Sequence, residues 1–251
     1  MCIIYKMLNI YKTIQMKPFL DEPEFNPNYK LHNMELKHIL INAPTGAGKS
    51  NWLINYILVT SNTFEHIYIF SKAPSCDPLY MMLKDKLGET LTLETVDKVP
   101  QLSQIKKYDQ SLIVFDDFIT SSKHIKETLD NYAIMSRKYH FQCIYLTQAY
   151  FKVSPELRQN CKYLVLLSLT NKRNKDLIIS QLSIDIKKTT INKIISNATE
   201  IKLNSCIIDL LSIDNPNKIF RRNFTEFYNI IDENNKELDT IQLYNKTGII
   251  N

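Results

Sequence analysis

Glycine and cysteine are both scarce in this sequence, with four glycines and five cysteines among 251 residues. No two cysteines form a C-x-x-C pair, which argues against a zinc site or a disulfide framework. Cys143 and Cys161 lie in or beside apolar runs, so we expect buried thiols and a reducing compartment. No apolar run approaches the roughly 18 residues that a membrane span needs, and the N-terminal segment lacks the features of a signal peptide. We therefore expect no contact with a membrane.

Charge is not extreme in either direction. A net charge of +5, with 23% charged and 44% apolar residues, indicates a folded domain with a sizeable core. The sequence pI of about 8.8 permits contact with nucleic acid. A solvated surface with a slight excess of lysine explains the same value equally well.

Short apolar runs alternate with longer amphipathic segments along most of the chain. This alternation predicts an α/β fold, with a mostly parallel sheet covered by helices on both faces. The expected strands are 38–42, 66–70, 90–96, 111–115, 141–146 and 163–167, and the expected helices are 49–59, 78–87 and 123–139.

Composition also divides the chain into four segments. We expect an N-terminal extension over 1–35, a core over 36–170, a C-terminal part of the same domain over 171–230, and a polar tail over 231–251 that frays. The third segment begins with a lysine-rich helical stretch, 171–195. It continues with a possible hairpin over 205–224 that turns at Asp-Asn-Pro-Asn.

Two of the four glycines, Gly46 and Gly48, fall in one short turn between a predicted strand and a predicted helix. The segment APTGAGKS (43–50) fits the phosphate-binding loop pattern, with alanine in place of the first glycine. Glycine permits the positive φ values with which successive backbone N–H groups wrap a phosphate, and the next helix points its N-terminus at the anion. Lys49 would reach the β- and γ-phosphates of ATP, and the Ser50 hydroxyl would bind Mg²⁺. The candidate ATP-binding residues are Ala43, Pro44, Thr45, Gly46, Ala47, Gly48, Lys49, Ser50 and Asn51.

A second motif, SLIVFDDF, places two carboxylates directly after a buried strand. Ligands of open α/β sheets bind at the carboxyl ends of the strands, so Asp116 is a candidate Mg²⁺ ligand. Asp117 then stands where a carboxylate can orient or deprotonate the attacking water. Its side chain is one methylene shorter than the glutamate more usual at that position, and a pair of helix-capping aspartates is the alternative reading.

The third motif is IYLTQAY, residues 144–150, which ends another buried strand. The amide of Gln148 can bond the γ-phosphate or the attacking water, so this residue can sense whether that phosphate is present.

With these three motifs in this order, the chain resembles the FtsK–HerA superfamily of DNA-translocating ATPases. Within it, the chain is most similar to the genome-packaging ATPases of large DNA viruses and virophages. The segments that carry the resemblance are APTGAGKS, LIVFDDF, SRKYHFQCIYLTQAYFKVSPELRQN and YLVLL. Asp77-Pro-Leu-Tyr80 also looks similar to the family, and the likeness covers roughly residues 36–225.

The resemblance implies a RecA-like core with an extra strand between the loop strand and the Asp116 strand. It implies ATP hydrolysis that drives double-stranded DNA through a homo-oligomeric ring of five or six subunits, with Gln148 as the sensor. It also implies an arginine finger from a neighbouring subunit, for which Arg158 and Arg137 both match family positions and Arg158 is favoured. Arg221 and Arg222 are weaker candidates.

For DNA contact, the expected residues are the basic side chains of the third segment, which can hold phosphates without reading bases. They are Lys172, Arg173, Lys175, Lys187 and Lys188. A capsid or portal protein is a further expected partner, and the expected location is the virus factory in the host cytoplasm or the virion. Two alternatives stay open: a P-loop nucleoside kinase and a nucleotide-switched assembly factor.

Overall fold

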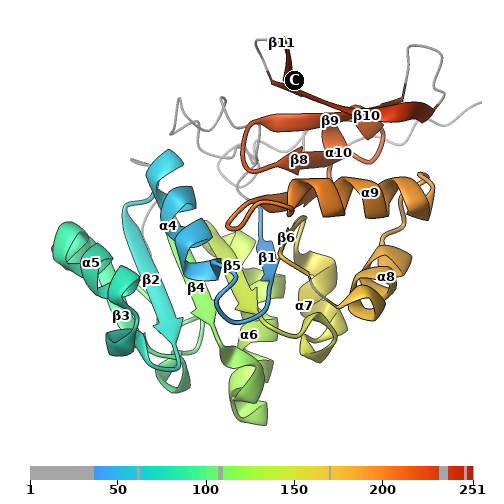
Figure 1. Ribbon diagram of the computed structural model, residues 1–251. Helices are drawn as coiled ribbons and strands as arrows, with labels where there is room; N and C mark the ends of the chain where they lie inside the picture. Colours follow the sequence, from blue (N-terminus) through green and yellow to red (C-terminus); the bar gives the residue numbers. More distant parts are fainter. Residues whose placement is uncertain are drawn as a thin grey trace, which may run out of the picture.

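The computed structural model describes residues 37–60, 63–106, 110–169, 171–231, 237–245 and 248–250. Within these residues one sheet runs through the molecule, with the strand order β11-β10-β9-β8-β7-β6-β1-β5-β4-β2-β3 (Figure 1). The expected N-terminal extension, 1–35, lies outside the described residues.

Six parallel strands form the half of the sheet that carries the three motifs. They are β1 (Ile39–Asn42), β2 (His66–Ser71), β3 (Leu91–Thr95), β4 (Ser111–Asp116), β5 (Phe141–Thr147) and β6 (Tyr163–Leu167). Strand β5 lies between β1 and β4, so the expected extra strand between the loop strand and the Asp116 strand is present. The predicted α/β fold with a parallel core is confirmed.

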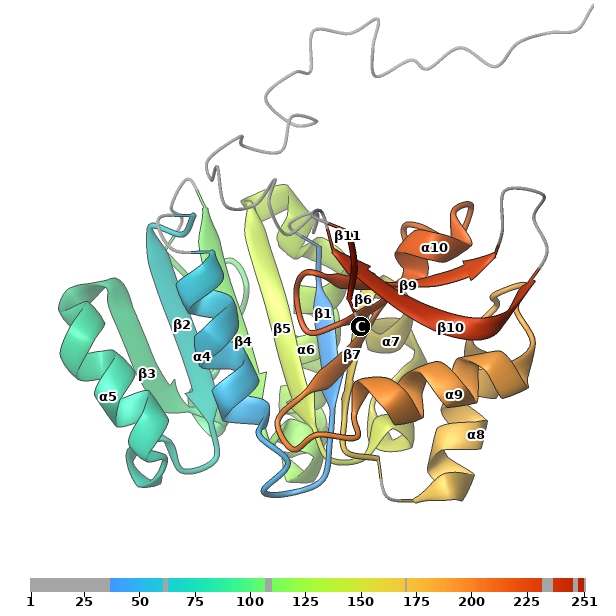
Figure 2. The same ribbon diagram turned by 45° about the horizontal axis from the view of Figure 1, so that its top comes forward.

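Helices cover both faces of the parallel strands, as Figure 2 shows. Helices α4 (Lys49–Val59) and α5 (Pro78–Leu87) pack on one face. Helices α6 (Lys123–Met135), α7 (Pro155–Asn160), α8 (Lys172–Gln181) and α9 (Lys188–Ala198) contribute to the core on the other. The strands alternate between the two cores, because successive side chains point to opposite faces. In β1, Ile39 and Ile41 pack in the α4 core, whereas Leu40 packs in the α6 core.

The C-terminal elements extend this sheet with antiparallel strands. They are β7 (Ser205–Asp209), β8 (Phe220–Arg222), β9 (Glu226–Ile231), β10 (Glu237–Asn245) and β11 (Gly248–Ile250). The expected hairpin over 205–224 is present as the antiparallel pair β7 and β8. Its connection contains a short helix, α10 (Pro216–Ile219), with proline at its start.

Three sequence expectations differ in part from the structure. The stretch 171–195 is helical as expected but is divided into two helices, because residues 182–187 leave the helical path and pack Leu182, Ile184 and Ile186 onto the core. The helix expected over 123–139 ends at Met135 and tightens into a 3-10 turn, Ser136–Tyr139, where Ser136 is buried against His38.

The third difference concerns the segment expected to fray. Strands β10 and β11 occupy much of 231–251. Leu243 packs against the core, and pairing with neighbouring strands satisfies the backbone hydrogen-bonding groups of a segment that mixes polar and apolar residues.

In the described part of the chain, none of the helices combines the length and the apolar character that crossing a membrane requires.

Candidate nucleotide-binding site

The phosphate-loop segment connects the end of β1 to the start of α4. Ala43 donates its N–H to the carbonyl of Thr147 at 3.0 Å, which continues the pairing of β1 with β5 by one residue. The chain then turns through Gly46, with a φ of 75°, and Gly48, with a φ of 97°. Both values lie in the left-handed region that glycine adopts without the steric cost of a Cβ. The sequence therefore folds here into an open turn that leads directly into a helix.

Helix α4 begins without a side chain to cap it. Gly48 precedes its first residue, and no described side chain accepts a hydrogen bond from its first turn. Helices α5 to α8 do begin with such a cap; the capping residues are Asp77, Ser122, Ser154 and Asn171. The N–H groups and the positive end of the α4 dipole are thus available to an anion.

Lys49 folds back over the loop. Its Nζ donates to the carbonyls of Ala43 at 3.1 Å and Pro44 at 3.3 Å. Burial lowers the pKa of Lys49, and the nearby carboxylates of Asp116 and Asp117 oppose that shift. The ammonium therefore lies between the loop and the aspartate pair, where a phosphate would give it a stronger partner than two carbonyls.

Asp116 ends strand β4 and is buried, with 6% of its surface exposed. Its Oδ2 accepts a hydrogen bond from the Tyr80 hydroxyl at 2.8 Å, whereas its Oδ1 is buried without a partner among the described residues. Burial raises the pKa of Asp116 to about 6, with a further contribution from the charge of Asp117. A buried carboxylate oxygen without a partner is costly, and a cation would relieve that cost.

Ser50 lies in the first turn of α4 and donates its hydroxyl hydrogen to Asp77 Oδ2 at 2.8 Å. Besides burial, the charges of Asp77 and Asp116 contribute to the raised pKa of Tyr80, and Asp77 also contributes to the raised pKa of Asp116. The Ser50–Asp77 and Tyr80–Asp116 contacts therefore belong to one cluster. A serine hydroxyl and a carboxylate oxygen are ligands that Mg²⁺ accepts. The residues present therefore fit this ion.

Gln148 connects the aspartate pair to the phosphate loop. Its Nε2 donates to Asp117 Oδ1 at 2.9 Å, and its Oε1 accepts from the Thr45 hydroxyl at 2.9 Å. Asp117 has a φ of 53°, which is uncommon for a residue with a side chain. The phosphate loop, the end of β4 and the end of β5 are joined through this one amide.

The structure thus brings Lys49, Ser50, Asp116, Asp117 and Gln148 together, all at the carboxyl ends of parallel strands. Asn51 follows in α4, where its carbonyl accepts from Asn55.

Two of the candidate arginines, Arg158 and Arg221, have their described partners outside this group of residues. Arg158 in α7 donates from Nη1 to Gln181 Oε1 at 2.6 Å and stacks over the ring of Tyr150, with 4.9 Å from its guanidinium carbon to the ring centroid. Arg137 lies in the 3-10 turn after α6, and its side chain is outside what the structure describes. Arg221 is 1% exposed and paired with Asp209 at 2.6 Å, so it is a structural ion pair rather than an accessible finger.

The basic residues expected to contact DNA gather on α8 and at the start of α9. Lys172, Arg173, Lys187 and Lys188 are exposed, and Lys175 is half-buried with its Nζ on Ser196 Oγ. None of them lines the loop site.

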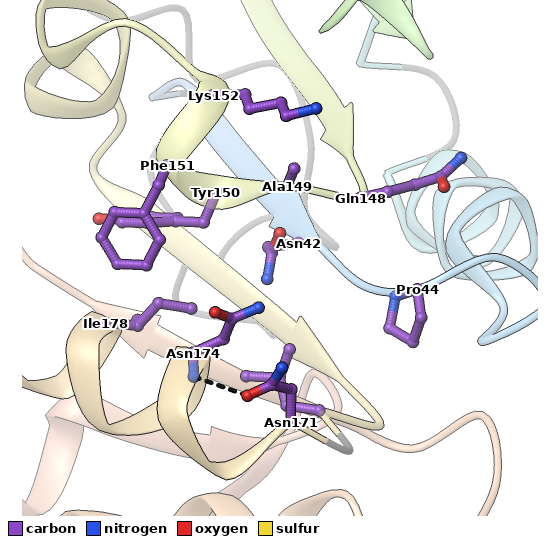
Figure 3. Close-up of a pocket in the computed structure, with 11 residues that line it drawn as sticks. Asn42, Pro44, Gln148, Ala149, Tyr150, Phe151, Lys152, Asn171, Asn174 and Ile178 are labelled. Carbon is purple, nitrogen blue, oxygen red and sulfur yellow. Dashed lines mark hydrogen bonds between the residues drawn. The ribbon is translucent and has the colours of Figure 1, made fainter.

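Some site residues received no role from the sequence. Asp77 and Tyr80 contact Ser50 and Asp116, and the family-like segment Asp77-Pro-Leu-Tyr80 was the signal that could have pointed to them. Asn42 was missed too: its buried Oδ1 has no partner among the described residues. It lines a cavity of about 270 Å³ that adjoins the loop at Pro44 and Gln148 (Figure 3).

The fold and this arrangement of loop, aspartate pair and glutamine define a P-loop NTPase. The family model for the poxvirus A32 protein matches residues 22–222, so this chain belongs to that family. No curated protein matches the chain.

Solved structures with the same fold include proteins from viruses of Sulfolobus. The genome-packaging NTPase B204 of Sulfolobus turreted icosahedral virus 2, in complex with AMP, is 13% identical, with a TM-score of 0.54 over 76% of this chain and 98% of that one. The same protein with AMPPCP is 14% identical, with a TM-score of 0.52 over 71% and 95%. The DNA-packaging ATPase B204 of Sulfolobus turreted icosahedral virus is 12% identical, with a TM-score of 0.50 over 75% and 97%. The chain thus belongs to a viral family and has the fold of these viral packaging ATPases, in agreement with the resemblance seen in the sequence.

Proposed function

We propose that this protein is a Mg²⁺-dependent ATPase subunit that moves double-stranded DNA and packages a viral genome into its capsid. The observation that carries the proposal is the meeting of an uncapped helix N-terminus and Lys49 with the buried, partly unpartnered carboxylate of Asp116. Membership of the poxvirus A32 family and the fold shared with viral packaging NTPases support it.

In this proposal the backbone N–H groups of residues 43–51 hold the triphosphate, and Lys49 binds its β- and γ-oxygens. Ser50 and Asp116 would hold Mg²⁺, and the ion would neutralise charge that develops on the phosphates. Among the described residues no cluster of three or more His, Cys, Asp or Glu side chains is built to hold a metal. Magnesium in such sites needs none, because it relies on one or two protein ligands together with phosphate and water.

Asp117 and Gln148 act on the attacking water. The Asp117 carboxylate accepts its proton or orients it, and the Gln148 amide connects that carboxylate to Thr45 in the phosphate loop. Because one amide touches both partners, a γ-phosphate that engages Gln148 would also change the position of Asp117.

An arginine completes each site from the neighbouring subunit, because the transition state gathers negative charge on the γ-phosphoryl oxygens. Arg158 is the favoured finger and Arg137 the second candidate. The described contacts of Arg158 in its own chain are with Gln181, Tyr150 and Phe151 rather than with the phosphate loop, which agrees with a role in trans.

The core, 36–170, carries all of these residues, and the third segment, 171–230, supplies the exposed basic side chains of α8 and α9 for DNA phosphates. We further propose a ring of five or six subunits, a capsid or portal protein as docking partner, and action in the virus factory of the host cytoplasm or in the virion.

The test is the rate of ATP hydrolysis by purified protein, with and without double-stranded DNA, over a series of protein concentrations. We expect turnover to rise with DNA and with concentration, to vanish in Lys49→Ala, and to fall at least 10²-fold in Asp117→Asn while ATP still binds. A nucleoside kinase would instead need a small phosphate acceptor. A nucleotide-switched assembly factor would keep its role in the host in Asp117→Asn, which still binds ATP but hydrolyses it slowly.

A further inference from the structure

The start of helix α5 contributes two polar side chains to the site that neither the phosphate loop nor the aspartate motif explains. Asp77 is the residue before the helix, and its Oδ1 accepts the backbone N–H of Leu79 at 2.9 Å. Its other oxygen, Oδ2, accepts the hydroxyl hydrogen of Ser50 at 2.8 Å. One carboxylate therefore caps α5 and orients the Ser50 side chain at the same time.

Tyr80 lies one turn further along α5 and is completely buried. Its hydroxyl donates to Asp116 Oδ2 at 2.8 Å, which leaves Oδ1 as the carboxylate oxygen without a partner among the described residues. A tyrosine ring packed in the core keeps its hydroxyl at a fixed point, so the direction of the free oxygen is fixed with it.

The Ser50–Asp77 and Tyr80–Asp116 contacts each leave one oxygen available to a cation. A serine hydroxyl has one hydrogen and two lone pairs, so a hydrogen committed to Asp77 leaves the oxygen lone pairs for a metal. A carboxylate with one oxygen bound to Tyr80 presents the other. Outer groups that orient metal ligands in this way are worth roughly 10–100-fold in metal affinity in other proteins.

We propose that Asp77 and Tyr80 are positioning residues that hold Ser50 and Asp116 ready for Mg²⁺, so that α5 sets the concentration of Mg²⁺ at which the protein works. This inference rests on the proposed function, because it assumes that the ion binds between these two side chains. Asp77 and Tyr80 act through Ser50 and Asp116 and touch neither phosphate nor water in this scheme.

Two conservative substitutions isolate the effect. Asp77→Asn keeps an oxygen that can cap α5 but removes the carboxylate that accepts from Ser50. Tyr80→Phe keeps the buried ring and removes only the hydroxyl. Matched controls are Asp185→Asn, an exposed aspartate between α8 and α9, and Tyr228→Phe, a buried tyrosine whose hydroxyl donates to Asn197 at 2.7 Å.

The measurement is the affinity of each full-length protein for a fluorescent ATP analogue, titrated with MgCl₂ and compared with the affinity in EDTA. In both variants we expect the half-saturating Mg²⁺ concentration to rise about 10-fold, with affinity in EDTA unchanged. Both controls should follow the wild type. A general loss of structure would lower both affinities together and would show in thermal melting. If Asp77→Asn does not fold, Asp77→Ser keeps the helix cap without the carboxylate.

The outcomes distinguish a failure of the positioning role from a failure of the proposed function. If the wild type binds the analogue in a Mg²⁺-dependent way and both variants need the same Mg²⁺ as the wild type, the positioning role is wrong and the proposed function stands. If the wild type itself binds no nucleotide, the proposed function fails, and this inference fails with it.

Discussion

Both the backbone conformation and the packing constrain Gly48 in the phosphate loop. Its φ is 97°, and a Cβ built there would lie 2.5 Å from Leu203 Cδ2. Gly88, between α5 and β3, has a φ of 53° with nothing within 4 Å of a built Cβ. The two glycines therefore share a positive φ but differ in ψ, which is 27° at Gly48 and −122° at Gly88, and in their surroundings.

We predict that Gly48→Ala and Gly88→Ala each lower the free energy of unfolding by about 1–2 kcal/mol, because alanine is strained at positive φ. Only Gly48→Ala should weaken nucleotide binding, by at least 10-fold. Urea unfolding and a nucleotide titration measure the two effects. Equal nucleotide affinity in both variants would show that the turn at Gly48 is not the phosphate cradle.

Asp116 imposes a stability cost that depends on pH. Its pKa in the folded protein is about 6, above the ordinary value of 3.8, so burial disfavours the charged form. The folded state binds more protons than the unfolded state between these two values, so the cost is complete above pH 6 and absent below about pH 3.8. Functional sites often retain such destabilising groups.

We predict that Asp116→Asn is more stable than the wild type by roughly 2–3 kcal/mol at pH 8, measured by urea unfolding without nucleotide or divalent cation. This difference should shrink towards zero near pH 4. A difference that stays constant between pH 4 and pH 8 would mean that the Asp116 carboxylate is not penalised by burial.

At the residue scale, the sequence predicts some members of the candidate site and misses others. Lys49, Ser50, Asp116, Asp117 and Gln148 could be predicted because each belongs to a contiguous motif at the end of a strand. Asp77 and Tyr80 could not be given their roles, because their contacts join residues 27 and 36 positions apart in the chain. Such contacts depend on how α5 packs beside α4, and no local pattern specifies that.

Among the secondary-structure elements, β7 and β8 are joined by a buried ion pair between Asp209 and Arg221. Arg221 also lies over the ring of Phe227, with its guanidinium carbon 5.0 Å from the ring centroid. Removing one member of a buried pair leaves the other charge uncompensated, which is more costly than the pair itself is stabilising.

We predict that Arg221→Ala lowers the free energy of unfolding by about 3–5 kcal/mol. The neighbouring Arg222→Ala, which breaks the half-buried pair with Glu226, should cost about 1 kcal/mol or less. Chemical denaturation of the two variants compares them directly. Equal losses would contradict the assignment of Arg221 to the structural core.

Elements with a simple pattern were predicted with near-correct bounds. The helix over Lys49–Val59 and the strand over Tyr163–Leu167 agree with the sequence prediction, because glycine or polar residues bound clear runs of apolar residues. The break between α8 and α9 and the strands β10 and β11 were missed. There the chain follows tertiary contacts, such as Ile186 and Leu243 packing on a distant core, rather than its own periodicity.

For the whole molecule, the question is whether one chain makes a complete site. In the described structure Arg158 contacts α8 and two aromatic rings rather than the phosphate loop of its own chain. In the proposed function the arginine of a neighbouring subunit supplies this cation, which would make hydrolysis a property of the assembly.

We predict that Lys49→Ala and Arg158→Ala subunits, each nearly inactive alone, regain part of the wild-type ATPase rate when mixed. A mixed assembly contains some interfaces with an intact loop on one side and an intact arginine on the other. Steady-state hydrolysis against the ratio of the two proteins measures this. Normal assembly without any recovery would remove Arg158 from this role, and the same mixture with Arg137→Ala would then test the second candidate.

The most direct test of the central claim is a crystal structure of this protein with AMPPCP and Mg²⁺. We predict that the backbone N–H groups of residues 46–50 surround the phosphates, with the ion held between the Ser50 hydroxyl and the Asp116 carboxylate. Phosphates bound elsewhere, or an ion with no link to either side chain, would contradict the account.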